Sequence, residues 1–187
     1  MTLTARIDYD IKCLEHYFQR LFDVLGDAIL ENASTPMNAQ DFDAIESQAT
    51  YHRFDQHIRP DMLINIYNLV DFWMKEICKY HKLKNNLNLE YRDIKGDNEL
   101  HAYKKYLVDY AGLDLTSAED SYKRLDELRR IRNVFIHSGG HVLGDETKKF
   151  SKIKGVTLTG SLLAVDDKYI WGTLAHAKSY LFIAAQA

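Results

Sequence analysis

A short stretch in the C-terminal half carries residue types that could act on a phosphodiester. It reads Arg132-Asn133-Val-Phe-Ile-His137, and Gly139 and Gly140 follow it closely. Arginine can bind phosphate oxygens through two parallel hydrogen bonds, and histidine titrates near neutral pH. Phosphodiester cleavage needs both a cation that holds the phosphate and a group that moves a proton. The stretch therefore indicates phosphodiester chemistry as a candidate function.

Each of these side chains also has a simpler structural interpretation. Arg132 falls at the edge of the apolar face that a helix here would bury, where a guanidinium is costly unless it meets an anion. A salt bridge to Asp71 or Glu76 on a neighbouring helix would supply that anion. His137 could be a cation at a helix C-terminus, which the helix dipole favours. The spacing alone favours these structural interpretations.

Helix geometry limits how Arg132 and His137 could act together. Five residues along a regular helix turn the side chain by roughly 500°, so the two side chains diverge by about 140°. The last turn could unwind at Gly139 and Gly140 and swing His137 toward Arg132. Alternatively, a two-fold dimer could place two such pairs in one shared cleft.

The N-terminal half reads as long amphipathic helices. Steps of three and four separate the apolar residues of a first helix, which should stop before Pro36. These residues are Ile7, Ile11, Leu14, Phe18, Leu21, Leu25 and Ala28. Asn38 is a candidate cap for a second helix that runs toward His57. Pro60 suits the first turn of a third helix, which residues 63–77 continue with a strongly apolar pattern.

The C-terminal half adds shorter elements around the motif. After a loop at 85–88, a helix over 100–110 can end at Gly112. Thr116 or Ser117, followed by acidic residues, predicts a capped start for a motif helix over about 117–138. The pattern then changes to a hairpin over about 155–166 and a final helix over about 167–185. We expect one all-α domain over 1–187, a helical bundle with a small β-hairpin insertion.

Composition excludes several classes of protein. The chain has 187 residues, 46% hydrophobic and 27% charged, with no apolar run near the roughly 20 residues of a membrane span. The N-terminus lacks the pattern of a signal peptide, and Cys13 and Cys78 fit reduced, buried thiols, so we expect a cytoplasmic protein that does not bind membranes. The net charge of -3 argues against a surface that is basic everywhere but permits a local basic site. Because the eight histidines lack ligand spacing, we expect no metal and no cofactor.

The motif and its surroundings resemble those of HEPN domains. The Arg132-to-His137 stretch is similar to the family's Arg-x(4-6)-His motif, including the polar residue after the arginine. Residues 63–71 resemble the family's inner helix, which often carries an acidic residue about where Asp71 stands. Residues 93–107 resemble a segment that precedes the motif helix in several bacterial HEPN groups. The resemblance covers roughly residues 55 to 140, and the remainder matches only in helical character.

The resemblance implies a compact, dimeric, all-α domain that, when active, cleaves RNA without a metal. Arg132 would then hold the scissile phosphate, and His137 would act as general acid or base. Asn133 would orient the histidine or the phosphate, and Asp71 would position Arg132. The RNA's own 2′-hydroxyl would attack, leaving a 2′,3′-cyclic phosphate or its hydrolysis product. The helix dipole favours protonated His137, which suits the acid role or simple phosphate binding more than the base role.

One departure from the family concerns silencing. Many toxin members carry a tyrosine two residues after the histidine, to which a partner nucleotidyltransferase can attach AMP. This chain has Gly139 there. We therefore do not expect silencing by that route, although an antitoxin of the nucleotidyltransferase type or another type could still bind.

Further basic residues lie near the motif. Arg129 and Arg130 precede it, and a group of lysines follows it: Lys148, Lys149, Lys152 and Lys154. The favoured interpretation of the lysines is a loop face exposed to solvent. The alternative is that, with the two arginines, they extend a surface that binds successive RNA phosphates.

Three functions remain open on the sequence. The first is a metal-independent endoribonuclease, the toxin of a toxin–antitoxin or phage-defence system. The second is a non-catalytic HEPN module that binds a nucleotide, RNA or a partner as a dimer. The third is a helical interaction protein in which the motif occurs by chance.

Overall fold

The computed structural model describes the backbone of residues 1–34 and 42–186, and the side chains of residues 1–24 and 56–186. The long helices are α1 (Leu3–Ser34), α2 (Phe42–Lys84), α4 (Glu119–Ser138) and α6 (Asp167–Gln186). Between them lie η1 (Tyr91–Asp93), α3 (Glu99–Lys105), the π-helical turn η2 (Tyr106–Tyr110), η3 (Thr116–Ala118) and α5 (Glu146–Phe150). The strands β1 (Val156–Thr159) and β2 (Leu162–Val165) form an antiparallel hairpin. The prediction of a mostly helical fold with one small hairpin is confirmed.

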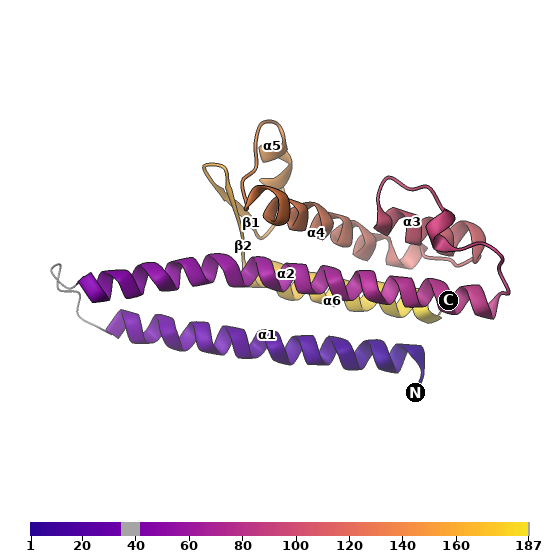
Figure 1. Cartoon of the computed structure of the whole chain (residues 1–187), viewed down its shortest axis with the longest axis horizontal. Coiled ribbons are helices and arrows are strands. Elements are labelled where there is room, and N and C mark those ends of the chain that lie inside the picture. Colours follow the sequence, from indigo (N-terminus) through magenta and orange to yellow (C-terminus); the bar gives the residue numbers. More distant parts are fainter. Residues whose placement is uncertain (35–41, 187) are drawn as a thin grey trace.

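The central pair of the bundle is α2 and α6. Helix α1 packs against both of them on one side, and α4 packs against both on the other side (Figure 1). The predicted seam of α1 is confirmed over its described side chains, since Ile7, Ile11 and Phe18 are fully buried and Leu14 and Leu21 pack against the core. The predicted seam residues Leu25 and Ala28 lie outside the described side chains. On α4 the buried positions are Leu125, Leu128 and Ile131, so its opposite face is free to carry polar side chains. The bundle therefore holds α4 rigidly along one face only.

Helix α2 differs from the prediction of two separate helices. Pro60 does not begin a helix but lies inside α2, which runs unbroken from Phe42 to Lys84. A proline inside a helix removes one hydrogen bond and costs about 3 kcal/mol. Burial offsets that cost here, because Ile58 and Met62 on either side of the proline both belong to the core. The predicted cap, Asn38, lies outside the described residues.

The start of α4 also differs from the prediction. Neither Thr116 nor Ser117 caps it; both lie in η3, and α4 begins at Glu119 with no side-chain cap. The Asp114 carboxylate, just before η3, accepts a hydrogen bond of 2.9 Å from the Thr116 N–H and another from the Thr116 hydroxyl. These hydrogen bonds lower the pKa of Asp114.

The end of α4 follows the predicted glycine pair. Gly139 adopts a left-handed conformation with φ 56°, and the N–H groups of Gly139 and Gly140 both donate to the Val134 carbonyl. The helix stays regular through Ser138, so the unwinding that would swing His137 toward Arg132 does not occur.

Backbone hydrogen bonds from the hairpin hold the segment that follows α4. Val142 N–H donates to the Ser161 carbonyl at 2.8 Å, and Leu163 N–H donates to the Gly140 carbonyl at 2.9 Å. Helix α6 then starts where predicted, with the Asp166 carboxylate accepting from the Tyr169 N–H. The segment from 141 to 150 is thereby held beside the last turns of α4.

The two cysteines differ in burial. Cys78 is buried as predicted, and burial raises the pKa of its thiol to about 12. The prediction is wrong for Cys13, which is exposed because it follows the core residue Ile11 by two positions and so points away from the seam. Within the described part of the chain, no helix is both long and apolar enough to cross a membrane.

Candidate functional site

The last two turns of α4 and the segment after them enclose an open groove of about 350 Å³. Helix α4 contributes one wall, because positions 130, 133, 134 and 137 follow each other at steps of three and one and so share a face. The segment 141–150 contributes the other wall. The groove is lined by Arg130, Asn133, Val134, His137, Ser138, His141, Val142, Leu143, Glu146 and Phe150. The structure thus brings Asn133 and His137 together with Arg130.

Arg132 lies at the side of this groove rather than in its wall. Its guanidinium carbon is 5.3 Å from the ring centre of Tyr67 on α2, a cation–π contact. Its Nη1 donates a hydrogen bond of 3.1 Å to Asn133 Oδ1. Its Nε is buried and has no hydrogen-bond partner among the described residues. Tyr67 and Asn133 therefore hold the Arg132 guanidinium in place, with one buried donor left unsatisfied among the described residues.

The carboxylates expected beside Arg132 are engaged elsewhere. Asp71 accepts a hydrogen bond of 2.7 Å from the Tyr103 hydroxyl and one of 2.6 Å from Lys75. Glu76 pairs with Lys79. The predicted contacts of Arg132 with Asp71 or Glu76 are therefore wrong, because α3 and the next turn of α2 present closer donors.

Tyr67 is the neighbour that the sequence did not indicate. Burial raises the pKa of its hydroxyl, and the charge of Asp71 raises it further, so the phenol stays neutral. The face of a neutral phenol ring attracts a guanidinium. The sequence did place Tyr67 one turn before Asp71 on the inner helix. Its contact with Arg132 could not be predicted from that spacing, because the contact depends on how α2 and α4 cross.

Asn133 connects the two halves of the motif. Its side-chain oxygen holds Arg132, and its side chain also lines the groove that His137 lines. The predicted divergence of Arg132 and His137 along a regular helix is consistent with this arrangement. Asn133 contacts Arg132 on one side and lines the same groove as His137 on the other.

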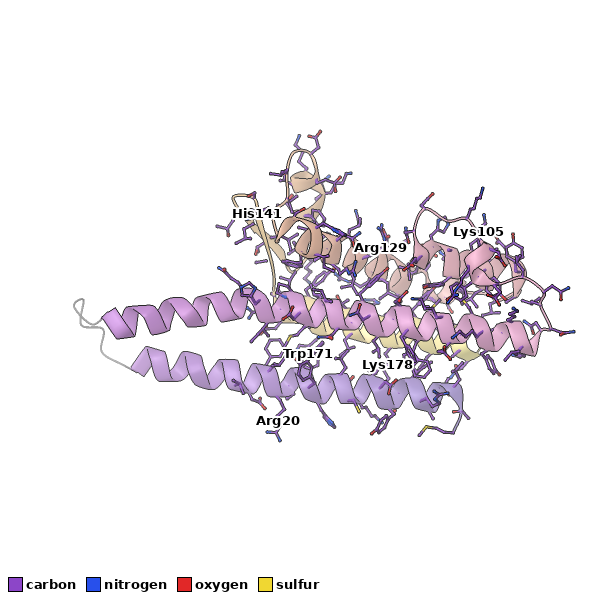
Figure 2. All side chains as sticks on the ribbon, in the orientation of Figure 1. Arg20, Lys105, Arg129, His141, Trp171 and Lys178 are labelled. Carbon is purple, nitrogen blue, oxygen red and sulfur yellow. The ribbon has the colours of Figure 1, made fainter. Side chains whose placement is uncertain are left out.

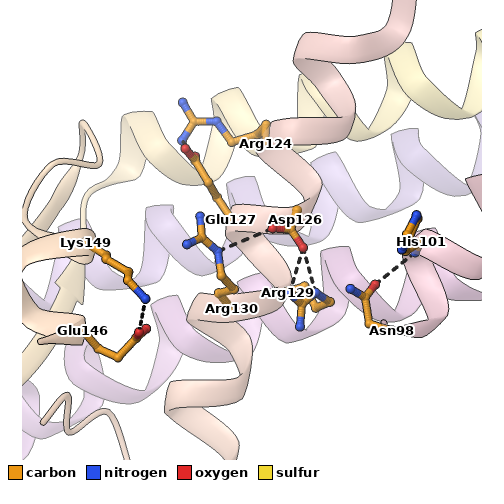
Figure 3. A network of polar contacts seen from close by, with 9 residues as sticks. All are labelled: Asn98, His101, Arg124, Asp126, Glu127, Arg129, Arg130, Glu146 and Lys149. Carbon is orange, nitrogen blue, oxygen red and sulfur yellow. Dashed lines mark hydrogen bonds and ion pairs between the residues drawn. The ribbon is translucent and has the colours of Figure 1, made fainter. Parts of the chain in front are cut away.

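The other arginines of the motif helix share one carboxylate. Arg129 pairs with Asp126 at 2.8 Å, and Arg130 approaches the same carboxylate at 3.5 Å (Figure 3). The longer distance is an ion pair without a hydrogen bond, and Arg130 Nε is buried without a described hydrogen-bond partner. Arg130 is therefore less tightly held than Arg129 and lines the groove as well.

The lysines after the motif do not form the groove wall. Lys148 and Lys149 lie on α5 and pair with Asp145 and Glu146. Lys152 and Lys154 are exposed on the loop that follows. Their arrangement fits the solvated face better than a continuous basic track.

His141 is a groove residue that the sequence prediction missed as a site residue. It lies over the same side of the molecule as Arg129 and α4 (Figure 2). Its ring Nδ1 is 2.9 Å from the Ser161 hydroxyl of the hairpin turn. Its place beside His137 depends on the hairpin folding back onto α4, which spacing alone does not reveal.

Comparisons with protein-family models, curated proteins and solved structures give no significant match to this chain.

Proposed function

We propose that this protein is a metal-independent endoribonuclease of the HEPN type that acts in the cytoplasm. The observation that carries the proposal is the groove at the end of α4, where His137, Asn133 and Arg130 lie in one wall and Asn133 holds Arg132 alongside. A proton-transfer group, an amide and two cations at one open site are the groups that RNA cleavage through the 2′-hydroxyl requires.

In the proposed reaction the 2′-oxygen attacks the neighbouring phosphorus and the bond to the 5′-oxygen breaks. Arg132 and Arg130 stabilise the charge on the phosphate oxygens, and Asn133 holds the Arg132 guanidinium in place. His137 gives a proton to the departing 5′-oxygen.

The active species in this proposal is a homodimer with the two motif helices facing each other across a two-fold axis. Two large apolar side chains near the end of α4 are exposed: Leu143, which lines the groove, is 77% accessible, and Ile136 on α4 is 43% accessible. Exposed apolar side chains bordered by polar groups are typical of a surface that another chain covers.

The proposed biological role is that of a toxin or phage-defence effector. Expression would then inhibit growth unless an antitoxin, of the nucleotidyltransferase type or another type, covers the groove. Gly139 in place of the modifiable tyrosine favours silencing by binding rather than by attachment of AMP.

The test is RNA cleavage by purified wild type, His137→Ala and Arg132→Ala, with excess EDTA present. We expect wild type to cut and leave 2′,3′-cyclic phosphate ends, and each variant to lose about 100-fold or more in rate. His16→Ala, an exposed histidine on α1, is the matched control and should cut like wild type. Loss of cleavage in EDTA with recovery in magnesium would contradict metal independence.

A second candidate is a non-catalytic module that binds RNA, a nucleotide or a partner. The contact of Arg132 with Tyr67 and Asn133 favours it, since these residues hold the guanidinium without any substrate. Wild-type protein that binds RNA in a salt-dependent way and never cuts it would support this candidate over the first.

A further inference from the structure

Two histidines line the groove, one from each wall. His137 belongs to the last turn of α4, and His141 belongs to the segment that returns toward the hairpin. Cleavage through the 2′-hydroxyl moves two protons, one off the attacking oxygen and one onto the leaving oxygen. The proposed ribonuclease reaction, as built from the motif alone, supplies a group for only one of them.

The backbone and the side chain of His141 are both held in place. Its N–H donates to the Ser138 carbonyl at 3.0 Å, and the residue pairs with Leu162 in an antiparallel bridge. Its Nδ1 lies 2.9 Å from Ser161 Oγ. When Nδ1 carries the proton and donates it to that hydroxyl oxygen, Nε2 is left with a free lone pair. Ser161 thus orients an imidazole whose second nitrogen can accept a proton.

The two rings reach the groove from opposite walls and have different neighbours. His137 shares the α4 wall with Arg130 and Asn133. His141 belongs to the facing segment, where Ser161 holds its Nδ1 and where the carboxylate of Glu146 is paired with Lys149. A phosphodiester lying in the groove would therefore have one imidazole on each side, which is the arrangement that an acid and a base acting together require.

We propose that His141 is the general base that works opposite His137 as the general acid, on an RNA phosphodiester bearing a 2′-hydroxyl. This inference rests on the proposed ribonuclease function and adds a catalytic residue to it. His141 Nε2 takes the proton of the 2′-hydroxyl while the 2′-oxygen bonds to phosphorus. The bond from phosphorus to the 5′-oxygen breaks, and His137 gives its proton to that oxygen. The product has a 2′,3′-cyclic phosphate and a free 5′-hydroxyl, and a proton returned through water resets the two rings.

The test uses an oligoribonucleotide that wild type cuts at one mapped linkage, and a second version with sulfur in place of the 5′-oxygen there. A sulfur leaving group departs without needing a proton, so it compensates for a missing acid but not for a missing base. We expect His141→Ala to lose at least about 100-fold on both substrates. His137→Ala should lose about as much on the oxygen substrate and recover most of its rate on the sulfur substrate. His141 is exposed, so the melting temperature of the variant should equal that of wild type.

Two further variants separate catalysis from positioning. Ser161→Ala removes the partner of Nδ1 and should reduce the rate several-fold while leaving KM unchanged, because it orients His141 without touching RNA. His16→Ala on α1 is the matched histidine control and should keep the wild-type rate.

The outcomes distinguish the two proposals. His141→Ala within about 3-fold of wild type, beside an inactive His137→Ala, would overturn the role of His141 and leave the ribonuclease intact. Recovery of His141→Ala on the sulfur substrate would overturn its assignment as base. Wild-type protein that cuts neither total RNA nor any test oligonucleotide would overturn both.

Discussion

The two halves of α4 differ in whether their basic side chains have acidic partners nearby. In the first half, each cation has a carboxylate about one turn away. These pairs are Lys123 with Asp120 at 3.4 Å and Arg124 with Glu127 at 3.2 Å. Between Leu128 and Ser138 the sequence has no acidic residue. Arg129 and Arg130 reach back to Asp126 of the first half, at 2.8 and 3.5 Å, and among the described residues Arg132 and His137 have no carboxylate partner.

This difference in ion pairing suggests different roles for the two halves of α4. Surface ion pairs contribute about 0 to 1 kcal/mol each, so the first half gains solubility and modest stability from its charges. In the second half Arg132 has no carboxylate partner among the described residues and lies beside an open groove, where its charge can attract an anion from outside. We interpret the first half as support and the second half as the working end.

The largest expected effect is on catalysis at the working end. Arg132→Ala should reduce RNA cleavage by about 100-fold or more, because it removes charge stabilisation from the phosphate. Arg124→Ala, which removes an arginine paired with Glu127 in the first half, should change the rate by less than about 3-fold. Initial rates on end-labelled RNA measure both.

If Arg132→Ala and Arg124→Ala reduced the rate of RNA cleavage equally, the proposed difference in role between the two halves would be contradicted. Arg132→Lys sharpens it: a lysine keeps the charge but neither the paired donors nor the stacking on Tyr67, so most of the activity should still be lost.

The next effect concerns the two exposed apolar side chains at the working end, Ile136 and Leu143. Ile136→Asp combined with Leu143→Asp places charge on the exposed side chains that we expect a second copy to cover. Sedimentation at micromolar concentration should show wild type at about twice the 21.7 kDa chain mass. The double variant should need at least about 10-fold more protein to dimerise, since burying charge costs at least about 1.4 kcal/mol. A wild-type monomer that still cuts RNA would contradict the dimer.

A smaller effect is expected from the supporting half. Asp126→Asn removes the carboxylate that Arg129 and Arg130 share. Stability should fall by no more than about 1 kcal/mol, because surface ion pairs that solvent still reaches contribute little. Retained charge on Arg130 should instead strengthen RNA binding at low salt. Urea unfolding measures the first change, and filter binding at two salt concentrations measures the second. A loss of several kcal/mol would mean that the pairs hold the helix in place.

The smallest effect tests the core rather than α4. His81 is fully buried, and burial lowers its pKa below the ordinary 6.5, against the hydrogen bond to the Ala184 carbonyl. Below pH 6.5 the unfolded chain takes up a proton that the folded chain resists. This contribution to stability is therefore complete above pH 6.5 and is lost as the pH falls.

Urea unfolding of wild type and His81→Gln at pH 7.5 and pH 5 checks this sign. Wild type should lose more stability on acidification than the variant, whose amide does not titrate. The carboxylates with lowered pKa, such as Asp8 and Glu90, lose their contributions only below about pH 4, so the window isolates histidine. Equal losses would contradict the role of His81.

Sequence patterns predicted the parts of the fold that depend on local spacing. The steps of three and four located the buried faces of α1 and α4, and Gly139 marked the end of the motif helix. Pro60 was misread because its local preference for a helix start competes with burial on both sides, which only the packed bundle reveals.

The candidate site was predictable only in part, for the same reason. Asn133 and His137 share a groove because they share a helix face, and that follows from the sequence. The contact of Arg132 with Tyr67 and the approach of His141 do not, because they depend on how α2 and the hairpin meet α4. Asp71 was assigned to Arg132 although Tyr103 and Lys75 lie closer to it.

The most direct test of the central claim compares wild type with His137→Ala on total RNA in excess EDTA. If the end of α4 is the working end, wild type leaves 2′,3′-cyclic phosphate ends, and His137→Ala cuts at least about 100-fold more slowly with an unchanged melting temperature. Cleavage by His137→Ala at the wild-type rate would contradict the assignment.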